Sequence, residues 1–339
     1  MGKSRRKSAA IVAKPAPCTL SLLEKPKKRK VLVIGGPTAS GKSKLSLELA
    51  QLIGGEILSV DSCQVYRGMD IGTAKPTAEE RSLITHHLVD VCDLTAPYNV
   101  AHFCSDAKKA LHEIIARDNV PIAVGGSGFY LRTLLYGPPS GPPSHPEIRA
   151  KLEQQINELG AEVLYERLQI LDPTYAATIS ERDRHKIVRA LEIIALSEKK
   201  VSEFPKSASL QEEEYDFRCW FIYYPREELY RRIETRCDEM IAQGLIEEVS
   251  SLEKVGLREN STAAGAIGYR QTLQYLDSGK TKEDLANFIS LFKRASRHCA
   301  KKQFTWFRKE PLFRWLNCQT YSQNELIEII LRDFEQDDS

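Results

Sequence analysis

One stretch of the sequence has the residue types and spacing that bind phosphate. Residues Gly36-Pro37-Thr38-Ala39-Ser40-Gly41-Lys42-Ser43 match the pattern GxxxxGK[ST]. In such a loop the backbone N–H groups surround phosphate oxygens, and the start of the following helix adds partial positive charge. Lys42 adds a full charge, and Ser43 can ligate Mg²⁺. The loop therefore predicts a diphosphate site with Mg²⁺ as a cofactor, although it does not say what carries the diphosphate.

A carboxylate is expected beside this loop. Asp61 closes a predicted strand over residues 56–60, and the carboxyl ends of parallel strands face one crevice. There it could act as a general base on a nucleophile that attacks the carbon bearing the diphosphate. It could equally hold Mg²⁺ or cap a turn.

The elements that must position these groups follow an α/β pattern. Short apolar runs at residues 31–34, 56–60, 120–124 and 218–224 predict strands. Leu45, Leu49 and Leu52 give the helix after the phosphate loop an apolar stripe, and a second helix is expected around residues 107–115. This alternation predicts a P-loop NTPase-like, doubly wound parallel sheet.

The chain is expected to divide into a tail, a catalytic core and a helical insertion. Residues 1–30 hold ten Lys or Arg against one acid, which predicts a mobile basic tail. A Pro- and Gly-rich stretch at 137–143 marks a boundary, and residues 140–205 are predicted as a helical insertion. The core is predicted over residues 31–139 and 206–320, and a C-terminal helix and tail over 321–339.

Composition narrows the class of protein. With 42% hydrophobic and 28% charged residues, the 339-residue chain is typical of a soluble, folded protein. No apolar run reaches the roughly 18 residues that cross a bilayer, so we expect no membrane contact. We also expect the protein to be cytoplasmic and monomeric. The basic start also suits an organellar transit peptide. Eight cysteines without a CxxC pair favour free thiols over a zinc knuckle or disulfide framework.

One absence bears on the reaction class. The predicted strand over 120–124 ends in Gly125-Gly126-Ser127-Gly128, where a P-loop kinase would usually place a Mg²⁺-coordinating acid. The sequence therefore disfavours a small-molecule kinase, the alternative from another enzyme class.

Several phrases occur together in the order found in one enzyme family. They are GPTASGKS, Asp61 to Pro76 (DSCQVYRGMDIGTAKP), Gly125 to Gly137, Gly265 to Arg270, and Lys301 to Arg308. With them the chain resembles bacterial-type tRNA dimethylallyltransferases from about Val31 to Arg308, which implies that the helical insertion over residues 140–205 binds tRNA. The resemblance implies transfer of a dimethylallyl group from dimethylallyl diphosphate to N6 of the adenosine immediately 3′ of the anticodon, in tRNAs that read UNN codons.

The resemblance also implies roles for individual residues. Gly36 to Ser43 would hold the diphosphate, Asp61 would accept the proton from the adenine amine, and Arg236 and Ser127 would complete the catalytic set. An exposed helix arginine is the alternative reading of Arg236. The residues implied to contact tRNA are Asp61, Ser62, Cys63, Gln64, Ser127, Arg149, His185, Lys186, Ile187, Val188, Arg189, Gly265, Ala266, Ile267, Gly268, Tyr269, Arg270, Lys301, Lys302, Gln303, Trp306 and Arg308.

Several alternatives remain open at this point. On a helix, Arg182, Lys186 and Arg189 share one face, which suits RNA phosphates but is often merely solvated. Phe304 and Phe307 could simply pack the last predicted helix into the core. An adenylate isopentenyltransferase, which prenylates free AMP, ADP or ATP, would share the phosphate loop and the aspartate. A non-catalytic RNA-binding protein would tolerate loss of Asp61.

Overall fold

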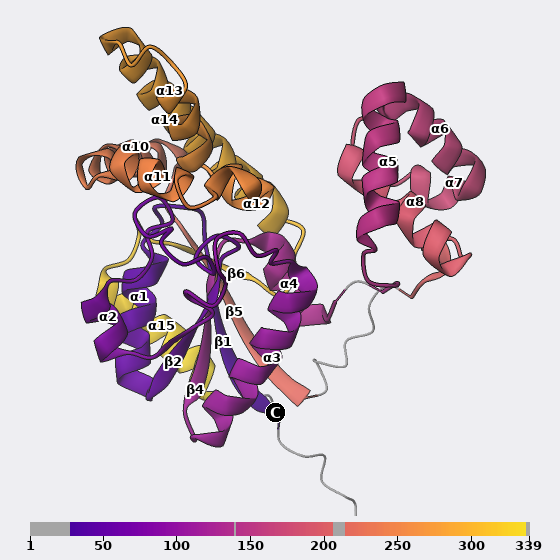
Figure 1. Ribbon diagram of the computed structural model, residues 1–339. Helices are drawn as coiled ribbons and strands as arrows, with labels where there is room; N and C mark the ends of the chain where they lie inside the picture. Colours follow the sequence, from indigo (N-terminus) through magenta and orange to yellow (C-terminus); the bar gives the residue numbers. More distant parts are fainter. Residues whose placement is uncertain (1–27, 139, 206–213, 337–339) are drawn as a thin grey trace, which may run out of the picture.

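The computed structural model describes residues 28–138, 140–205 and 214–336, so most of the predicted basic tail lies outside the described residues. Within them, six parallel strands form one sheet in the order β3-β2-β4-β1-β5-β6 (Figure 1). The strands are β1 (Arg29–Gly35), β2 (Gly55–Val60), β3 (His86–His87), β4 (Val120–Gly125), β5 (Tyr215–Tyr223) and β6 (Arg314–Asn317). The predicted parallel α/β fold is confirmed. The edge strands β3 and β6 were not predicted, because each is too short to carry an apolar run.

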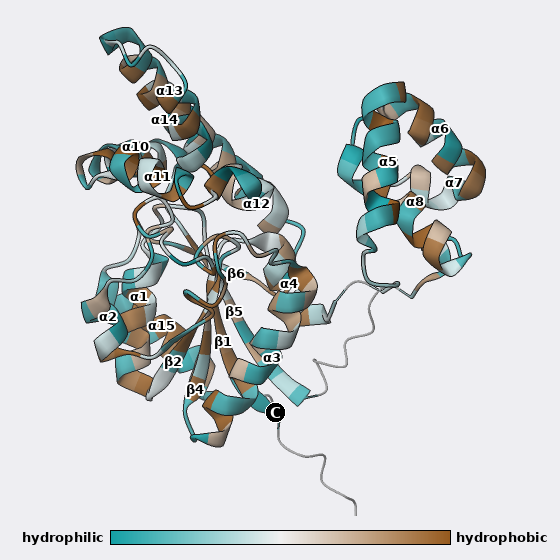
Figure 2. Ribbon diagram, viewed as in Figure 1, coloured by the Kyte–Doolittle hydropathy of each residue, from teal (hydrophilic) through white to brown (hydrophobic). Residues whose placement is uncertain are grey.

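Helices cover both faces of the sheet. On one face α1 (Lys42–Ile53) and α15 (Gln323–Glu335) pack against β1, β2, β4 and β5. On the other face lie α3 (Val100–Ala116) and α4 (Gly128–Tyr136). Figure 2 shows the hydrophobic residues of β1 in the middle of these layers. The C-terminal helix, predicted apart from the core, belongs to it, because Leu326, Ile330 and Phe334 are buried against the sheet.

Two sequence expectations need correction. Leu52 is 61% exposed, and the buried face of α1 is formed by Leu45, Ser46, Leu49 and Ala50. Because Ser46 and Ala50 are buried beside Leu45 and Leu49, the buried face of α1 points away from Leu52. In addition, Lys30 belongs to β1 and not to a tail, since its Nζ donates to the carbonyl of Phe334 at 2.6 Å.

A group of helices, here called the helical cap, covers the carboxyl ends of the strands (Figure 1). It contains α10 (Arg226–Ala242), α11 (Leu245–Glu253), η2 (Leu257–Glu259), α12 (Ser261–Ala264), α13 (Tyr269–Leu276) and α14 (Lys282–Phe307), while the short α2 (Ala78–Leu83) lies beside the sheet. The end of α14 reaches the sheet, where the fully buried Phe307 packs on Phe221 with ring centroids 4.4 Å apart. The cap is thereby fixed over the strand ends that carry the predicted site.

The insertion is helical, as its sequence predicted. It contains α5 (Pro146–Leu159), α6 (Ala161–Leu171), α7 (Pro173–Ala176), α8 (Arg184–Ser197) and η1 (Val201–Glu203), and it stands to one side of the sheet (Figure 1). Leu164, Leu168, Ile187 and Leu191 are among the residues that form its own buried cluster. In the described part of the chain, no helix is both long and apolar enough to cross a membrane.

Candidate active site

The phosphate loop joins β1 to α1 in a tightly turned conformation. Ala39 and Gly41 have positive φ angles of 63° and 87°, and the N–H of Ser40 donates to the carbonyl of Pro37 at 3.3 Å. A Cβ at Gly36 would lie 2.6 Å from Ser40 Oγ, so that position has no room for a side chain. Because α1 begins directly after Gly41, its first-turn N–H groups open toward the cleft.

Two cations from different helices line the cleft above this loop. The cleft has a volume of about 1800 Å³. Lys42 begins α1 and Arg236 lies in α10. Burial and the repulsion of Arg236 lower the pKa of Lys42 to about 8, although the attraction of Asp61 opposes the shift. Burial also lowers the pKa of Arg236. Neither cation forms an ion pair with a carboxylate of the described residues. Such a pair of cations is suited to bind an anion.

Asp61 follows β2, and its negative charge attracts both Lys42 and Arg236. Its Oδ1 accepts hydrogen bonds from the N–H groups of Cys63 at 2.8 Å and Gln64 at 3.3 Å. The neighbouring N–H of Ser62 donates to Ser127 Oγ at 3.2 Å, which ties the end of β2 to the loop after β4. The carboxylate is therefore fixed at the strand edge where the general base was predicted.

The side chains of Cys63 and Gln64 differ in what they offer a substrate. Burial, with the nearby Asp61 charge, raises the pKa of Cys63 to about 12, so its thiol stays neutral in the cleft. Gln64 Nε2 donates to the carbonyls of Thr73 and Ala74, both at 3.2 Å, and its Oε1 accepts from Ser59 Oγ at 2.8 Å. The side chain of Gln64, which the resemblance implied to contact tRNA, thus orders the loop that contains Thr73 and Ala74.

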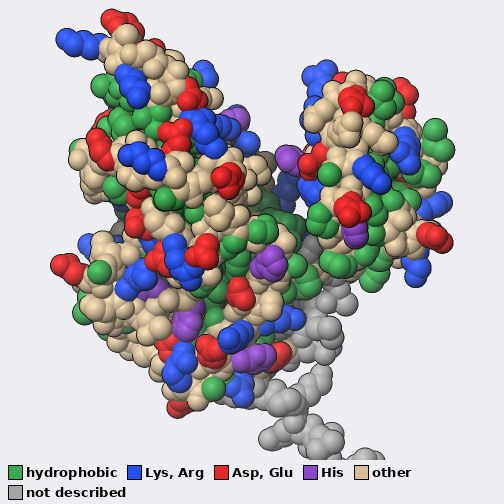
Figure 3. Space-filling view, viewed as in Figure 1, with side chains coloured by type: hydrophobic (Ala, Val, Ile, Leu, Met, Phe, Trp, Pro, Cys, Tyr) green, Lys and Arg blue, Asp and Glu red, His purple; other side chains and the backbone are tan. Residues whose placement is uncertain are grey.

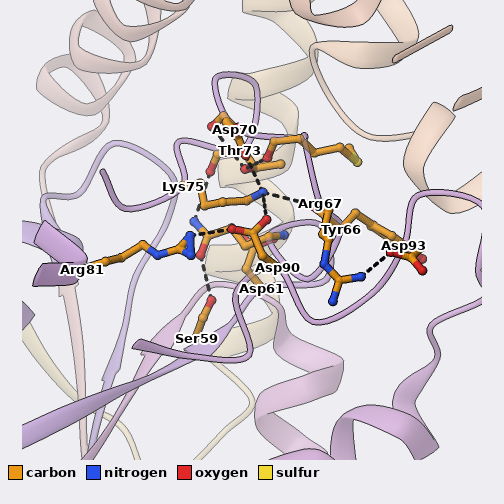
Figure 4. A network of polar contacts seen from close by, with 12 residues as sticks. Ser59, Asp61, Tyr66, Arg67, Asp70, Thr73, Lys75, Arg81, Asp90 and Asp93 are labelled. Carbon is orange, nitrogen blue, oxygen red and sulfur yellow. Dashed lines mark hydrogen bonds and ion pairs between the residues drawn. The ribbon is translucent and has the colours of Figure 1, made fainter. Parts of the chain in front are cut away.

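That loop is anchored by a polar network (Figure 4). The ammonium group of Lys75 donates to the carbonyl of Tyr66 at 2.9 Å and pairs with Asp70 and Asp90, both at 2.6 Å. Arg81 pairs with the other oxygen of Asp90 at 2.5 Å. Since the Lys75 side chain is only 3% exposed, water screens these contacts little and they hold the loop in place.

The last turns of α14 close the cleft from the opposite side. Gln303 accepts from the N–H of Thr38 at 3.1 Å and donates to the carbonyl of Gly126 at 3.0 Å, so it links two strand-end loops. Trp306 lies so close to Gly128 that a Cβ there would be 2.4 Å from its ring. Lys302 lines the cleft beside them, whereas Arg308 is exposed and lies outside it.

The residues implied to contact tRNA occupy three kinds of environment. Tyr269, Ile187 and Val188 are at most 2% exposed, so most of each side chain packs into a core, although Tyr269 also lines the cleft. Their contact with tRNA stays a prediction. Gly268 is also buried and Arg270 is exposed outside the cleft. The remaining members that line the cleft are Asp61, Ser62, Cys63, Gln64, Ser127, Gly265, Ala266, Ile267, Lys302, Gln303 and Trp306, while Lys301 lines a smaller groove beside Lys302 and Trp306.

In the insertion, two of the predicted arginines face a buried acid. Glu192 is fully buried, and although burial alone would raise its pKa, hydrogen bonds from Ser144, Arg189 and the His145 N–H lower it. Arg189 pairs with Glu192 at 2.7 Å, and Arg149 lies 3.8 Å from the same carboxylate. Both arginines therefore hold the base of the insertion together.

Other basic side chains of the insertion face solvent. Arg182 and Lys186 are 82% and 57% exposed, and His185 is also exposed. They supply the accessible part of the predicted basic face.

Sequence reasoning missed Arg232. Its Nε donates to the carbonyl of Ala39 in the phosphate loop at 2.9 Å, and its guanidinium lies 4.4 Å from the ring centroid of Tyr224. Its spacing of four residues from Arg236, on the same face of a helix, was the available signal.

Comparisons with known proteins agree with this geometry. A family model described as IPP transferase matches residues 64–310, and one described as isopentenyl transferase matches residues 29–95. The chain is 54% identical to the tRNA dimethylallyltransferase of Protochlamydia amoebophila (strain UWE25), over 91% of this chain and 90% of that protein. It is 45% identical to the protein of the same name from Chlamydia pneumoniae, with 91% and 90% covered.

Solved structures give the same assignment. The tRNA isopentenylpyrophosphate transferase of Bacillus halodurans is 36% identical with a TM-score of 0.65, over 91% of this chain and 97% of that one. A eukaryotic dimethylallyltransferase acting on tRNA is 27% identical with a TM-score of 0.76, over 91% and 79%. The matching family model, the identity to curated relatives and the shared fold show that this chain belongs to the IPP transferase family, that of the tRNA dimethylallyltransferases.

Proposed function

We propose that the protein transfers the dimethylallyl group of dimethylallyl diphosphate to N6 of the adenosine 3′ of the anticodon, in tRNAs that read UNN codons. The observation that carries the proposal is the cleft in which Lys42 and Arg236 face Asp61 above the phosphate loop. Two cations and a set of backbone amides match a diphosphate, and the carboxylate matches an acceptor for one proton.

These groups suit displacement at an allylic carbon. The bond between C1 of the prenyl group and the diphosphate oxygen breaks while C1 bonds to adenine N6, and the amine proton passes to Asp61. An exocyclic adenine amine is a weak nucleophile, so the enzyme gains most by stabilising the departing diphosphate and receiving the proton. Lys42, Arg236 and the loop N–H groups perform the first task and Asp61 the second.

The residues present also fit Mg²⁺ bound together with the substrate. Ser43 lines the cleft, and no cluster of three or more His, Cys, Asp or Glu able to hold a metal occurs among the described residues. Ser43 would therefore supply one ligand, with diphosphate oxygens and water completing the shell that Mg²⁺ prefers. When bound, the ion would neutralise charge on the leaving group.

A tRNA would reach the cleft between the insertion and the helical cap. Figure 3 shows these two parts as separate masses beside and above the sheet domain, both bearing Lys and Arg side chains. The exposed Arg182, His185 and Lys186 would contact RNA phosphates, and the target adenosine would leave its stack to enter the cleft. Since one chain supplies all these groups, we propose a monomer that acts where tRNA is found, in the cytoplasm.

The test is transfer itself. Purified protein with Mg²⁺ and labelled dimethylallyl diphosphate is incubated separately with UNN-reading tRNA, with other tRNAs and with AMP, and the nucleosides are identified by mass spectrometry. We expect prenylated adenosine in UNN-reading tRNA and far slower labelling of AMP. Equal or faster labelling of AMP would instead indicate an adenylate isopentenyltransferase, and chelation of Mg²⁺ without loss of rate would remove the metal from the proposal.

A further inference from the structure

A carboxylate of the helical cap binds a turn that lies far away in the sequence. Glu248 of α11 accepts hydrogen bonds from the N–H groups of Asp70 at 3.0 Å, Ile71 at 2.7 Å and Gly72 at 3.3 Å. The hydroxyl of Tyr269 donates to the same carboxylate at 2.6 Å. Four donors on one carboxylate, three of them consecutive backbone groups, form a specific anchor.

The anchored turn is also held by close packing. A Cβ at Gly72 would lie 2.4 Å from the Tyr269 ring, and Tyr269 itself is fully buried. The ring therefore sets how far the turn can approach the cap, while Glu248 sets its rotation. Residues 70–74 line the cleft, whereas Glu248 does not. Glu248 therefore acts on the cleft through this turn and through Tyr269, which also lines it.

The same turn leads to the proposed general base. The carbonyls of Thr73 and Ala74 accept both hydrogen bonds that the Gln64 side-chain Nε2 donates. The backbone N–H of Gln64, together with that of Cys63, donates to the Asp61 carboxylate. A path of hydrogen bonds, joined by the backbone of residues 70–74 and of Gln64, therefore runs from Glu248 to Asp61.

We propose that Glu248 is a positioning residue for the transfer reaction, which fixes residues 70–74 so that Gln64 holds the Asp61 carboxylate toward the bound diphosphate. This inference rests on the proposed function, in which Asp61 accepts the proton. Lys75 holds the following position through Asp70 of the turn and also through Tyr66 and Asp90 outside it, so loss of Glu248 would loosen the turn without releasing the whole loop.

The experiment compares Glu248→Gln with Glu247→Gln, a neighbouring exposed glutamate on the same helix. In Glu248→Gln, the new side-chain amide would present an NH₂ group to N–H donors and lose part of the anchor. We expect kcat on tRNA to fall on the order of ten- to a hundredfold, as for a catalytic group displaced by up to about 1 Å. The KM for dimethylallyl diphosphate and the Kd for tRNA should stay within about twofold. Glu247→Gln should match the wild type.

A second readout needs no catalysis. Amide hydrogen exchange in Glu248→Gln should speed up in peptides covering residues 69–75 and also 61–64, with the rest of the cap unchanged. Tyr269→Phe, which keeps the ring on Gly72 and removes one donor, should give a smaller change of the same kind. Unchanged exchange at 61–64, or a parallel loss of kcat, substrate affinity and thermal stability, would overturn the inference. Failure of the wild type to prenylate tRNA would refute the proposed function, while the exchange result would still test the connection to Asp61.

Discussion

The charge of Lys42 should make binding at the proposed diphosphate site depend on pH. Burial beside Arg236 lowers its pKa from the ordinary 10.5 to about 8, because the free cleft disfavours the ammonium form. Bound diphosphate favours that form, so binding draws a proton to Lys42 where the free residue has lost it. Lys42 is about nine-tenths protonated at about pH 7 and about one-tenth protonated at about pH 9, so the affinity should fall roughly tenfold between them.

Isothermal titration of inorganic diphosphate and of dimethylallyl diphosphate would measure this change. Titrations at the higher pH in buffers of different ionisation enthalpy should show proton uptake on binding. Lys42→Arg keeps a permanent charge and should bind with an affinity that hardly changes over the same range. Equal wild-type affinity at both pH values, or the same slope in the arginine variant, would refute the assignment of the dependence to Lys42.

Three further perturbations address other parts of the molecule. Asp61→Asn should bind tRNA normally but transfer the prenyl group at least about a hundredfold more slowly, the usual scale for a general base, and near-normal turnover would make Asp61 structural. Lys186→Ala should weaken tRNA binding and lower its salt slope by about one, as for one phosphate contact; an unchanged slope would place this side chain off the RNA path. Hydrogen bonds from Arg117, opposed by burial and aided by His87 and Asn119, lower the pKa of Glu56 from 4.5 to about 2. The ionised Glu56 therefore stabilises the fold above about pH 4.5, and this stabilisation is lost as the pH falls through 2. Glu56→Gln should therefore lower the free energy of unfolding near neutral pH by on the order of 2–3 kcal/mol and flatten its acid dependence, and denaturant titrations that show no difference would contradict this.

The predictable part of the molecule is local. Apolar runs and the GxxxxGK[ST] spacing encode the central strands, the phosphate loop and the place of Asp61, because each depends on neighbours in the chain. The partners of Gln303 and Glu248 could not be found this way, since Thr38 and Gly72 lie 265 and 176 residues away from them. Likewise, the motif containing Tyr269 resembles a binding phrase, but only packing reveals a buried ring.

The insertion carries its own interior, and this separates two physical tasks. Among the described residues, the buried cluster around Leu168 and Ile187 shares no member with the three clusters of the sheet and cap. Damage to that interior should melt one unit while leaving the pyrophosphate cradle intact. Substitutions in the insertion can therefore change how tRNA is bound without disturbing the groups that carry out the reaction.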